Sequence, residues 1–483
     1  MGSEMCIRDR GKFSTNDARD MTVKLVIDKL KPGKTYYYAF KCDGETSVTG
    51  RTRTLPEGAV EKLGLAVASC SNYPFGYFNA YEAIALDPAV DVVLHLGDYL
   101  YEYGADGYGG EQGAKIGREH VPTTEIVSLD DYRQRHAQYK ADPGSRAMHA
   151  AHPLIAIWDD HESTNNSWRE GAQNHQPETE GDWRQRRAAS LKAYYEWMPV
   201  RDPAEGMRPE QFWRHYRFGE LVSLVTLETR HTGRDKQLDY GDFQELLQSP
   251  EGVGEFITEH LGAPDRHLLS PDMEAFLAQA LRGSVKEGQA WRMIGNPIPM
   301  ARSYIPRVTD EHLEQLAIDE THYLYEEARN FQALGGAELP MYLDAWDGYP
   351  WARERFYQLC RDAGADDLLV LTGDSHSFWQ NTLFTAEGDA MGLELGTTGI
   401  TSPSAFSSLG VDAVTLLDSL ITERSPEVQW TEGITRGYLR LVLTPAKASV
   451  DYVGVNTVTE RDYLPVNVRQ VQVLREDGQL RYS

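Results

Sequence analysis

Residues 63–98 read LGLAVASCSNYPFGYFNAYEAIALDPAVDVVLHLGD, and this stretch decides the class of fold. Leu63–Ala68 and Val90–Leu96 are short apolar runs of strand length, and Phe78–Leu86 between them has helical spacing. Two buried strands joined by a helix form a parallel unit with a right-handed crossover. The stretch therefore predicts an α/β fold.

The same alternation continues along the chain. Further apolar runs with the length of buried strands lie at 154–158, 221–227, 291–294 and 368–371. Helical patterns lie among them at 132–139, 183–198, 271–281 and 352–363. Strand-like patterns dominate after residue 397, at 437–443, 448–453 and 470–474. We therefore expect a mixed α/β domain over residues 57–483 that ends in antiparallel strands.

Residues 1–56 have a different pattern, with expected strands at 22–27, 35–41 and 47–54. A Leu-x-Pro-Gly turn at 30–33 precedes a Tyr-x-Tyr strand, which resembles the end of a fibronectin type III-like sandwich. Three strands make a poor independent sandwich, so we expect a truncated all-β N-terminal domain. The first ten residues contain no apolar segment of the kind found in a signal peptide.

The charge balance excludes some classes of function. The chain has 483 residues with 48 Lys and Arg against 73 Asp and Glu, a formal net charge of −25. This argues against nucleic-acid binding through a basic patch and against attachment to anionic lipid. No apolar run approaches the roughly 20 residues that span a bilayer. The four cysteines show no closely spaced pair, so neither a disulfide scaffold nor a zinc knuckle is predicted.

Polar side chains follow each of the six apolar runs. The segments are 69–72, 97–103, 159–162, 228–230, 295–296 and 372–376. Ligands of open α/β sheets bind outside the carboxyl ends of the strands, so we expect these segments to meet at one edge. Any one Gly-Asp after a strand is more often a turn, and a lone buried Cys is usually a hydrophobe. Carboxylates gathered in this way need cations to offset their charge, so the recurrence predicts a site with more than one metal.

The motifs at these positions resemble those of a known family. Gly97-Asp98-x-x-Tyr101, Asp159-Asp160-His161-Glu162 and Gly373-Asp374-x-His376 are similar to blocks of calcineurin-like metallophosphoesterases. The variants seen here resemble the alkaline phosphatase D (PhoD-like) family, as do segments 68–70, 228–230, 347–350 and 401–404. The resemblance runs from about residue 36 to about residue 452. It implies a four-layer α/β/β/α sandwich preceded by the fibronectin-like piece.

The resemblance also implies two kinds of metal. It assigns iron(III) to Cys70, Asp98, Tyr101 and His376, and calcium to Asp98, Asp160, Asn296 and Asp374. Thiolate, phenolate and imidazole ligands suit a transition ion, and oxygen ligands suit calcium. Asp159 is expected beside the site, or as a further calcium ligand.

Three kinds of side chain are expected to act on the substrate. His161 would stabilise the transition state or protonate the leaving group. Arg230 would contact the phosphoryl oxygens through its planar fork, with an ion-pair role as the alternative. Asn165 and Asn166 would contact substrate or, alternatively, only cap a loop.

The predicted function is hydrolysis of phosphate monoesters, diesters or both by a metal-activated hydroxide, in a secreted or periplasmic protein. One alternative is a phospholipase D-like phosphodiesterase that acts on lipid or polymer phosphodiesters. Another is a non-catalytic extracellular calcium-binding module. A structural calcium site has little use for an imidazole, a thiolate or a phenolate, so His161, Cys70 and Tyr101 favour an enzyme.

Overall fold

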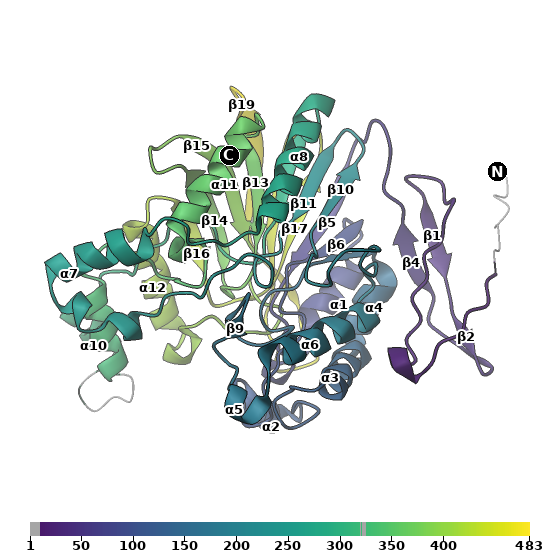
Figure 1. The fold of residues 1–483 in the computed structure, drawn as a ribbon, viewed down its shortest axis with the longest axis horizontal. Coiled ribbons are helices and arrows are strands. Elements are labelled where there is room, and N and C mark those ends of the chain that lie inside the picture. Colours follow the sequence, from purple (N-terminus) through teal and green to yellow (C-terminus); the bar gives the residue numbers. More distant parts are fainter. Residues whose placement is uncertain (1–9, 319, 321–324) are drawn as a thin grey trace.

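The computed structural model describes residues 10–318, 320 and 325–483, and two seven-stranded sheets form its centre (Figure 1). The first sheet contains, in spatial order, β20 (Gln479–Tyr482), β19 (Pro465–Glu476), β18 (Lys447–Val455), β17 (Arg436–Leu443), β5 (Leu63–Ala68), β6 (Val92–His95) and β7 (Leu154–Ala156). The second contains β10 (Arg214–Phe218), β11 (Val222–Thr226), β12 (Trp291–Gly295), β13 (Leu368–Thr372), β15 (Ala390–Gly396), β14 (Phe378–Phe384) and β16 (Val428–Glu432).

Helices cover the outer faces of both sheets. The α-helices are α1 (Asn79–Leu86), α2 (Gly110–Ile116), α3 (Leu129–Ala141), α4 (Pro143–Ala151), α5 (Pro177–Glu180), α6 (Trp183–Trp197), α7 (Pro250–Glu255), α8 (Pro271–Glu287), α9 (Asp310–Gln315), α10 (Tyr325–Leu334), α11 (Pro350–Asp362) and α12 (Val411–Arg424). Helices α8 and α11 lie on the second sheet, and α1, α3, α4 and α6 lie on the side of the first (Figure 1). No helix within the described residues is both long enough and apolar enough to cross a bilayer.

Strand β13 shows how the four layers are built. Leu369 and Leu371 join the core that contains the first sheet, whereas Leu368 and Val370 join the core beneath α8 and α11. Successive residues of a strand point to opposite faces, so an unbroken apolar run fits a strand that is buried on both sides. The predicted four-layer α/β/β/α architecture is confirmed.

The strand directions place the carboxyl ends that matter for function. Strands β5, β6 and β7 are parallel to one another, as are β11, β12 and β13. Strands β17, β18, β19 and β20 are antiparallel, as the end of the sequence predicts. The expectation of a single sheet edge needs correction, because three of the six runs lie in each sheet. Hydrophobic periodicity identifies a strand but does not say which sheet contains it.

The helix ends follow from local sequence. Helix α3 begins with a capping box in which Ser128 and Asp131 bond each other's main chain. The Ser270 side chain caps α8, which has Pro271 at its first position. The same helix ends at Gly288, whose φ of 68° is the left-handed conformation that glycine adopts most readily. These signals fix where the helices over the two sheets begin and end.

Residues 10–56 form two small sheets beside the main body. Strand β1 (Thr35–Tyr38) pairs with β4 (Gly50–Arg53), and β2 (Lys41–Cys42) pairs with β3 (Glu45–Thr46). The prediction of a strand at residues 22–27 is wrong. Val23, Val26 and Ile27 are exposed, and no described strand pairs with this segment. A strand needs the backbone hydrogen bonds of a partner.

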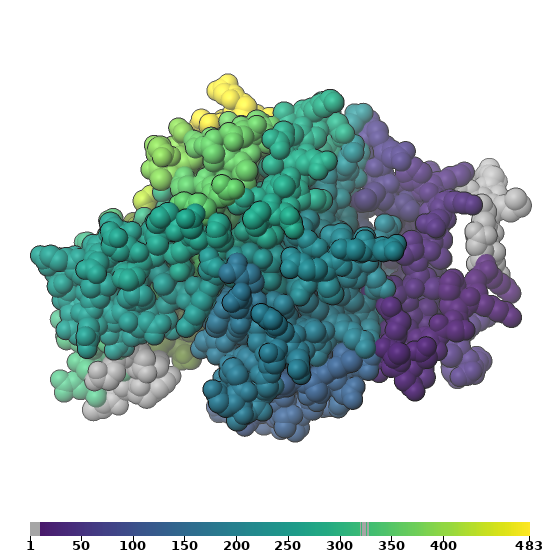
Figure 2. Space-filling model, in the orientation of Figure 1, coloured from purple at the N-terminus to yellow at the C-terminus, as the bar shows by residue number. Residues whose placement is uncertain are grey.

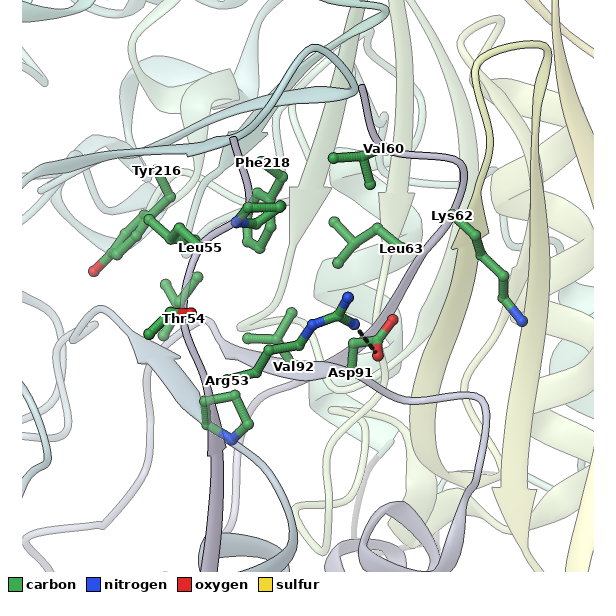
Figure 3. Close-up of a pocket in the computed structure, with 13 residues that line it drawn as sticks. Arg53, Thr54, Leu55, Val60, Lys62, Leu63, Asp91, Val92, Tyr216 and Phe218 are labelled. Atoms are coloured by element: carbon green, nitrogen blue, oxygen red, sulfur yellow. Dashed lines mark hydrogen bonds and ion pairs between the residues drawn. The ribbon is translucent and has the colours of Figure 1, made fainter. Parts of the chain in front are cut away.

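The N-terminal segment packs at the right of the molecule (Figure 2). Arg53 pairs with Asp91 at 2.6 Å beside a pocket of about 180 Å³ at this junction (Figure 3). Leu55, Leu63 and Phe218 contribute apolar walls to the pocket. Leu63 is the first residue of β5, so the pocket lies at the sheet edge opposite the carboxyl ends. On the other side of the molecule, α7 and α10 project as a separate lobe (Figure 1).

Candidate metal centre

The polar segments predicted from the sequence meet where the two sheets end. Potential ligand atoms form three groups, and within each group the atoms lie within 4.8 Å of one another. The groups are Cys70 with Asp98 and His376, Asp98 with Asp160 and His161, and Asp98 with Asp159 and Asp374. Asp98 belongs to all three groups, which is the position expected of a carboxylate shared between two cations. The structure thus brings together donors from the loops that follow β5, β6 and β7 of one sheet and β13 of the other.

The backbone at these positions adopts an unusual conformation. Cys70, Asp98, Asp374 and His376 have φ values of 59°, 55°, 64° and 58°. This left-handed region is disfavoured for residues with a Cβ, at about 1–2 kcal/mol each. Such conformations persist where surrounding structure imposes them, and they cluster at functional sites. The sharp turns direct four neighbouring donors to one place immediately after their strands.

Sulfur, phenol, carboxyl and imidazole donors form one half of the centre. Asp98 Oδ2 lies 3.4 Å from Cys70 Sγ and 3.1 Å from Tyr101 Oη. The Tyr101 Oη lies 3.2 Å from Nε2 of His376, whose Nδ1 lies 2.7 Å from the carbonyl oxygen of Pro403. A proton on Nδ1 donated to that carbonyl leaves Nε2 with a free lone pair, as a metal ligand requires.

Carboxylates and an arginine form the other half. Arg230 is fully buried, and its Nε lies 2.5 Å from Asp159 Oδ1. Its Nη1 lies 2.7 Å from Asp344 Oδ2, while Nη2 lies 3.9 Å from Asp160 Oδ2 without a hydrogen-bond partner. The guanidinium is therefore held among carboxylates, and only Nη2 is free for another oxygen. This geometry fits the ion-pair alternative for Arg230 better than a full fork on phosphate.

The electrostatics of the centre call for added positive charge. Burial, with the neighbouring Asp160, raises the pKa of Asp98 well above its ordinary value. Burial likewise raises the pKa of Asp374 well above its ordinary value and that of Asp159 to about 6. Oδ1 of Asp98 and Oδ2 of Asp159 are buried without a hydrogen-bond partner. Buried carboxylate oxygens of this kind fit cation ligands, so the residues present suit the implied metals.

The pKa shifts of Cys70 and Tyr101 also call for added positive charge at the centre. Burial, together with the charge of Asp98, raises the pKa of the Cys70 thiol and of the Tyr101 phenol well above their ordinary values. A transition metal binds the deprotonated form of each group and would reverse these shifts.

His161 is positioned by a residue that the sequence analysis did not assign. Its Nδ1 lies 2.6 Å from Oε2 of the fully buried Glu102. Oε1 of Glu102 accepts hydrogen bonds from Thr164 Oγ1, the Asn165 main-chain N–H and Asn174 Nδ2, at 2.8–3.0 Å. The imidazole also stacks on Tyr101 with ring centroids 4.0 Å apart. With Nδ1 engaged, Nε2 is the nitrogen left for the substrate.

Both polar atoms of the Asn296 side chain already have hydrogen-bond partners. Its Oδ1 accepts a hydrogen bond of 3.2 Å from Nε1 of Trp346, and its Nδ2 donates to the carbonyl of Ile298 at 2.6 Å. An amide oxygen has two lone pairs, so one remains available.

Asn165 and Asn166 contribute through their main chain. The Asn166 N–H donates to Asp160 Oδ2 at 2.6 Å, and the Asn165 N–H donates to Glu102. The Asn165 side chain bonds Gln173 at 2.5 Å. These contacts favour the loop-capping alternative for both residues.

Two more glutamates hold the loops in place. Glu162 accepts hydrogen bonds from the main-chain N–H groups of Asp98, Tyr99 and Asp159 at 2.6–3.1 Å, and so joins the ends of β6 and β7. Glu228 accepts the N–H groups of residues 230 and 231 and the indole Nε1 of Trp158. Glu162 stands in the quoted motif, so its position was a usable signal.

Comparison with known proteins identifies relatives over most of the chain. The sequence model of a family described as "PhoD-like phosphatase" matches residues 65–452, and "PhoD-like phosphatase, N-terminal domain" matches residues 3–56. Alkaline phosphatase D of Bacillus subtilis (strain 168) is 34% identical over 447 residues, 91% of this chain and 67% of that protein. A solved structure described as "Structure of PhoD" has a TM-score of 0.72 and 30% identity, with 94% of this chain and 78% of that chain covered.

Proposed function

Because the chain belongs to the PhoD-like phosphatase family and is a phosphoric ester hydrolase, we propose that it hydrolyses phosphate monoesters, diesters or both at an iron(III)/calcium centre. The observation that carries the proposal is Asp98, which is common to three groups of donors and has a buried oxygen without a partner. A shared carboxylate is the feature that two adjacent cations require.

The donor chemistry divides the centre into two sites. We assign iron(III) to Cys70, Tyr101 and His376 with Asp98, because sulfur, phenolate and imidazole suit a transition ion. We assign calcium to Asp98, Asp160 and Asp374 with Asn296, and Asp159 lies close enough to take part. When bound, the cations would supply an activated water and offset the charge that develops on the phosphoryl oxygens.

The residues of the chain orient the reacting groups. Glu102 accepts a hydrogen bond from the Nδ1–H of His161 and fixes the plane of the imidazole against Tyr101. Nε2 of His161 then delivers a proton to the oxygen of the departing alcohol, or donates a hydrogen bond to it in the transition state. Arg230 keeps Asp159 in place through Nε and is itself restrained by Asp344.

Elemental analysis of the native protein, with rates on paired substrates, tests this proposal. We expect iron and calcium in the purified protein and release of nitrophenol from 4-nitrophenyl phosphate, bis(4-nitrophenyl) phosphate or both. A chelator should abolish the activity, and the two metals together should restore it. Full activity in protein free of iron would overturn the iron assignment.

Family membership argues against a non-catalytic calcium-binding module. A phosphodiesterase that acts on lipid or polymer esters would use the same centre, and rates on the substrate pair would distinguish it. From the family resemblance we further propose a secreted or periplasmic protein. We also propose a division of the chain into an N-terminal β domain, residues 1–56, and a catalytic domain, residues 57–483.

A further inference from the structure

A groove of about 780 Å³ lies at the same edge of the molecule as the metal centre. Its walls come from the segments after β5, β6, β15 and β18 and from the loop before β17. Strand β17 is antiparallel to β5, so the start of β17 adjoins the carboxyl end of β5, where Cys70 lies. The groove therefore opens beside the centre and not at the opposite end of the sheets.

Two residues connect the groove to the metal centre. Tyr108 lines the groove, and its ring lies 6.4 Å from the ring of Tyr101. Pro403 also lines the groove, and its carbonyl oxygen is the partner of His376 Nδ1 at 2.7 Å. The Tyr108 Oη donates to the same carbonyl at 3.4 Å. Tyr108 and Pro403 thus form a direct connection between the metal centre and the groove.

Arg436 is the only charged residue among the described residues that line the groove. Its side chain is 8% exposed. Nη1 makes long hydrogen bonds to the carbonyl oxygens of His376, Gly433 and Thr435, at 3.3–3.5 Å. Within the described part of the chain, Nε and Nη2 donate no hydrogen bond and no carboxylate pairs with the guanidinium.

Other buried arginines differ from Arg436 in a consistent way. Arg118 pairs with Asp142 at 2.8 Å, and Arg353 pairs with Asp347 at 2.6 Å. Arg135 lacks a carboxylate partner, but its Nε, Nη1 and Nη2 each donate to a backbone carbonyl. Arg118 and Arg353 each also keep one nitrogen without a partner, but a carboxylate neutralises both. A buried guanidinium with unused donors and no paired carboxylate is costly unless an anion reaches it, and here the space for that anion is present.

The nearest carboxylate does not satisfy this requirement. Glu432 favours the charged form of Arg436 at a distance, but its carboxylate accepts hydrogen bonds from the Thr435 N–H and Oγ1 at 2.9–3.2 Å. It lies outside ion-pair distance of Arg436. The two free nitrogens of the guanidinium are therefore available to a ligand in the groove.

We propose that the groove receives the part of the ester beyond the reacting phosphoryl group, and that Arg436 pairs there with a second phosphate of the substrate. This inference rests on the proposed hydrolase function and specifies its substrate class as esters with two phosphoryl groups. A planar guanidinium pairs well with phosphate, and the walls add hydroxyl donors such as those of Ser404 and Thr457.

A matched pair of substrates tests the inference. One is the 4-nitrophenyl phosphodiester of glycerol, and the other is the same diester with a second phosphate on the glycerol. Both release nitrophenol from the same reacting group. We expect the holoenzyme to show kcat/KM about 10- to 100-fold higher for the doubly phosphorylated ester, the range of one charge-assisted hydrogen bond.

The variant Arg436→Gln should reduce that ratio to near one. The matched control is Arg440→Gln on the same strand, because Arg440 pairs with Asp87 and Asp451 away from the groove. We expect this control to keep the wild-type ratio. The ratio is measured within each protein, so a change in the amount of active enzyme does not affect it.

The outcomes separate this inference from the function on which it rests. If neither ester nor 4-nitrophenyl phosphate is hydrolysed, the proposed function fails and the inference fails with it. If the esters are hydrolysed at equal rates by wild-type protein, the hydrolase stands and the role of the groove is refuted. A ratio that survives Arg436→Gln would refute the role of Arg436. The wild-type measurement holds even if the variant does not fold.

Discussion

Replacing Glu102 by glutamine tests whether His161 acts as a proton donor. Oε1 of Glu102 accepts three hydrogen bonds, and Oε2 faces Nδ1 of His161 at 2.6 Å. A glutamine can place its carbonyl oxygen where Oε1 lies and keep those three bonds. Its NH₂ group then faces Nδ1 and donates to it. The imidazole must become the neutral tautomer with its proton on Nε2, which is a much weaker acid than the imidazolium ion.

The size of the effect follows from the interaction that is lost. A hydrogen bond to a charged group contributes about 1.5–3 kcal/mol, and 1.4 kcal/mol corresponds to a factor of ten. We therefore expect Glu102→Gln to lower kcat about 10- to 100-fold for an alkyl phosphate. The loss should be much smaller for 4-nitrophenyl phosphate, because nitrophenolate leaves without a proton. His161→Ala should show the same substrate dependence with a larger loss, up to the roughly 10²–10⁴-fold contribution of general acid catalysis.

The assay compares steady-state rates on the two substrates with metal content by elemental analysis. Glu196→Gln is the matched control, because Glu196 is a buried glutamate that pairs with Arg133 outside the centre. It should leave both rates unchanged. Equal losses on the alkyl and nitrophenyl esters, or loss of metal from Glu102→Gln in proportion to activity, would refute proton donation by His161.

Three further changes test other parts of the structure. Asp98→Asn should abolish turnover of an aryl phosphate, because Asp98 joins all three donor groups; unchanged turnover would contradict the two-metal mechanism. Tyr101→Phe should remove a visible phenolate-to-iron charge-transfer band, and a colourless, iron-free and fully active wild type would contradict the iron assignment. Burial raises the pKa of Asp418 to about 6, so its contribution to stability is fully present below pH 4 and is lost as pH rises through 6. Asp418→Asn should therefore raise the free energy of unfolding at pH 7.5, but not at pH 4, by at most about 2 kcal/mol after allowance for partial exposure. Denaturant titrations at the two pH values would measure this, and an equal change at both would contradict it.

The sequence predicted strands β5, β6, β7, β11, β12 and β13 because they are buried on both faces, but it did not predict β10, β14, β15 and β16 of the second sheet. Leu63–Ala68 was predicted to the residue, and the other five buried runs differ from the observed strands only near their ends. Helix α8 begins at Pro271 as predicted but extends to Glu287, beyond the predicted end at residue 281. Its last turns contain polar residues, and the apolar spacing from which we predicted the helix stops before them. The strand expected at 22–27 had the right composition but no pairing partner, which composition cannot reveal.

The candidate ligands were predictable because each follows a strand directly. The groups that hold them were harder to find. Glu102 stands four residues after Asp98, and only its distance from His161 reveals its role. Asp344 lies in the long segment between β12 and β13, three residues before segment 347–350, and belongs to none of the motifs quoted from the sequence. It contacts Arg230 and Arg234 because the chain folds back over the centre. Contacts of this kind depend on tertiary structure and leave no local pattern.

The charge balance of the centre explains why Arg436 is significant in an acidic protein. The donor groups contain the aspartates 98, 159, 160 and 374, whereas Arg230 is the arginine that contacts them. Arg230 is itself shared with Asp344, so its single charge offsets only part of this negative charge. Positive charge for the reacting phosphoryl group must therefore come from bound cations.

Arg436 lies outside this balance, next to His376 and without a carboxylate of its own. Since the chain as a whole carries −25, an anionic substrate needs a local positive potential to approach the centre. Together, the cations and Arg436 would supply that potential at two adjacent points, which favours a substrate with two phosphates over one with a single phosphate.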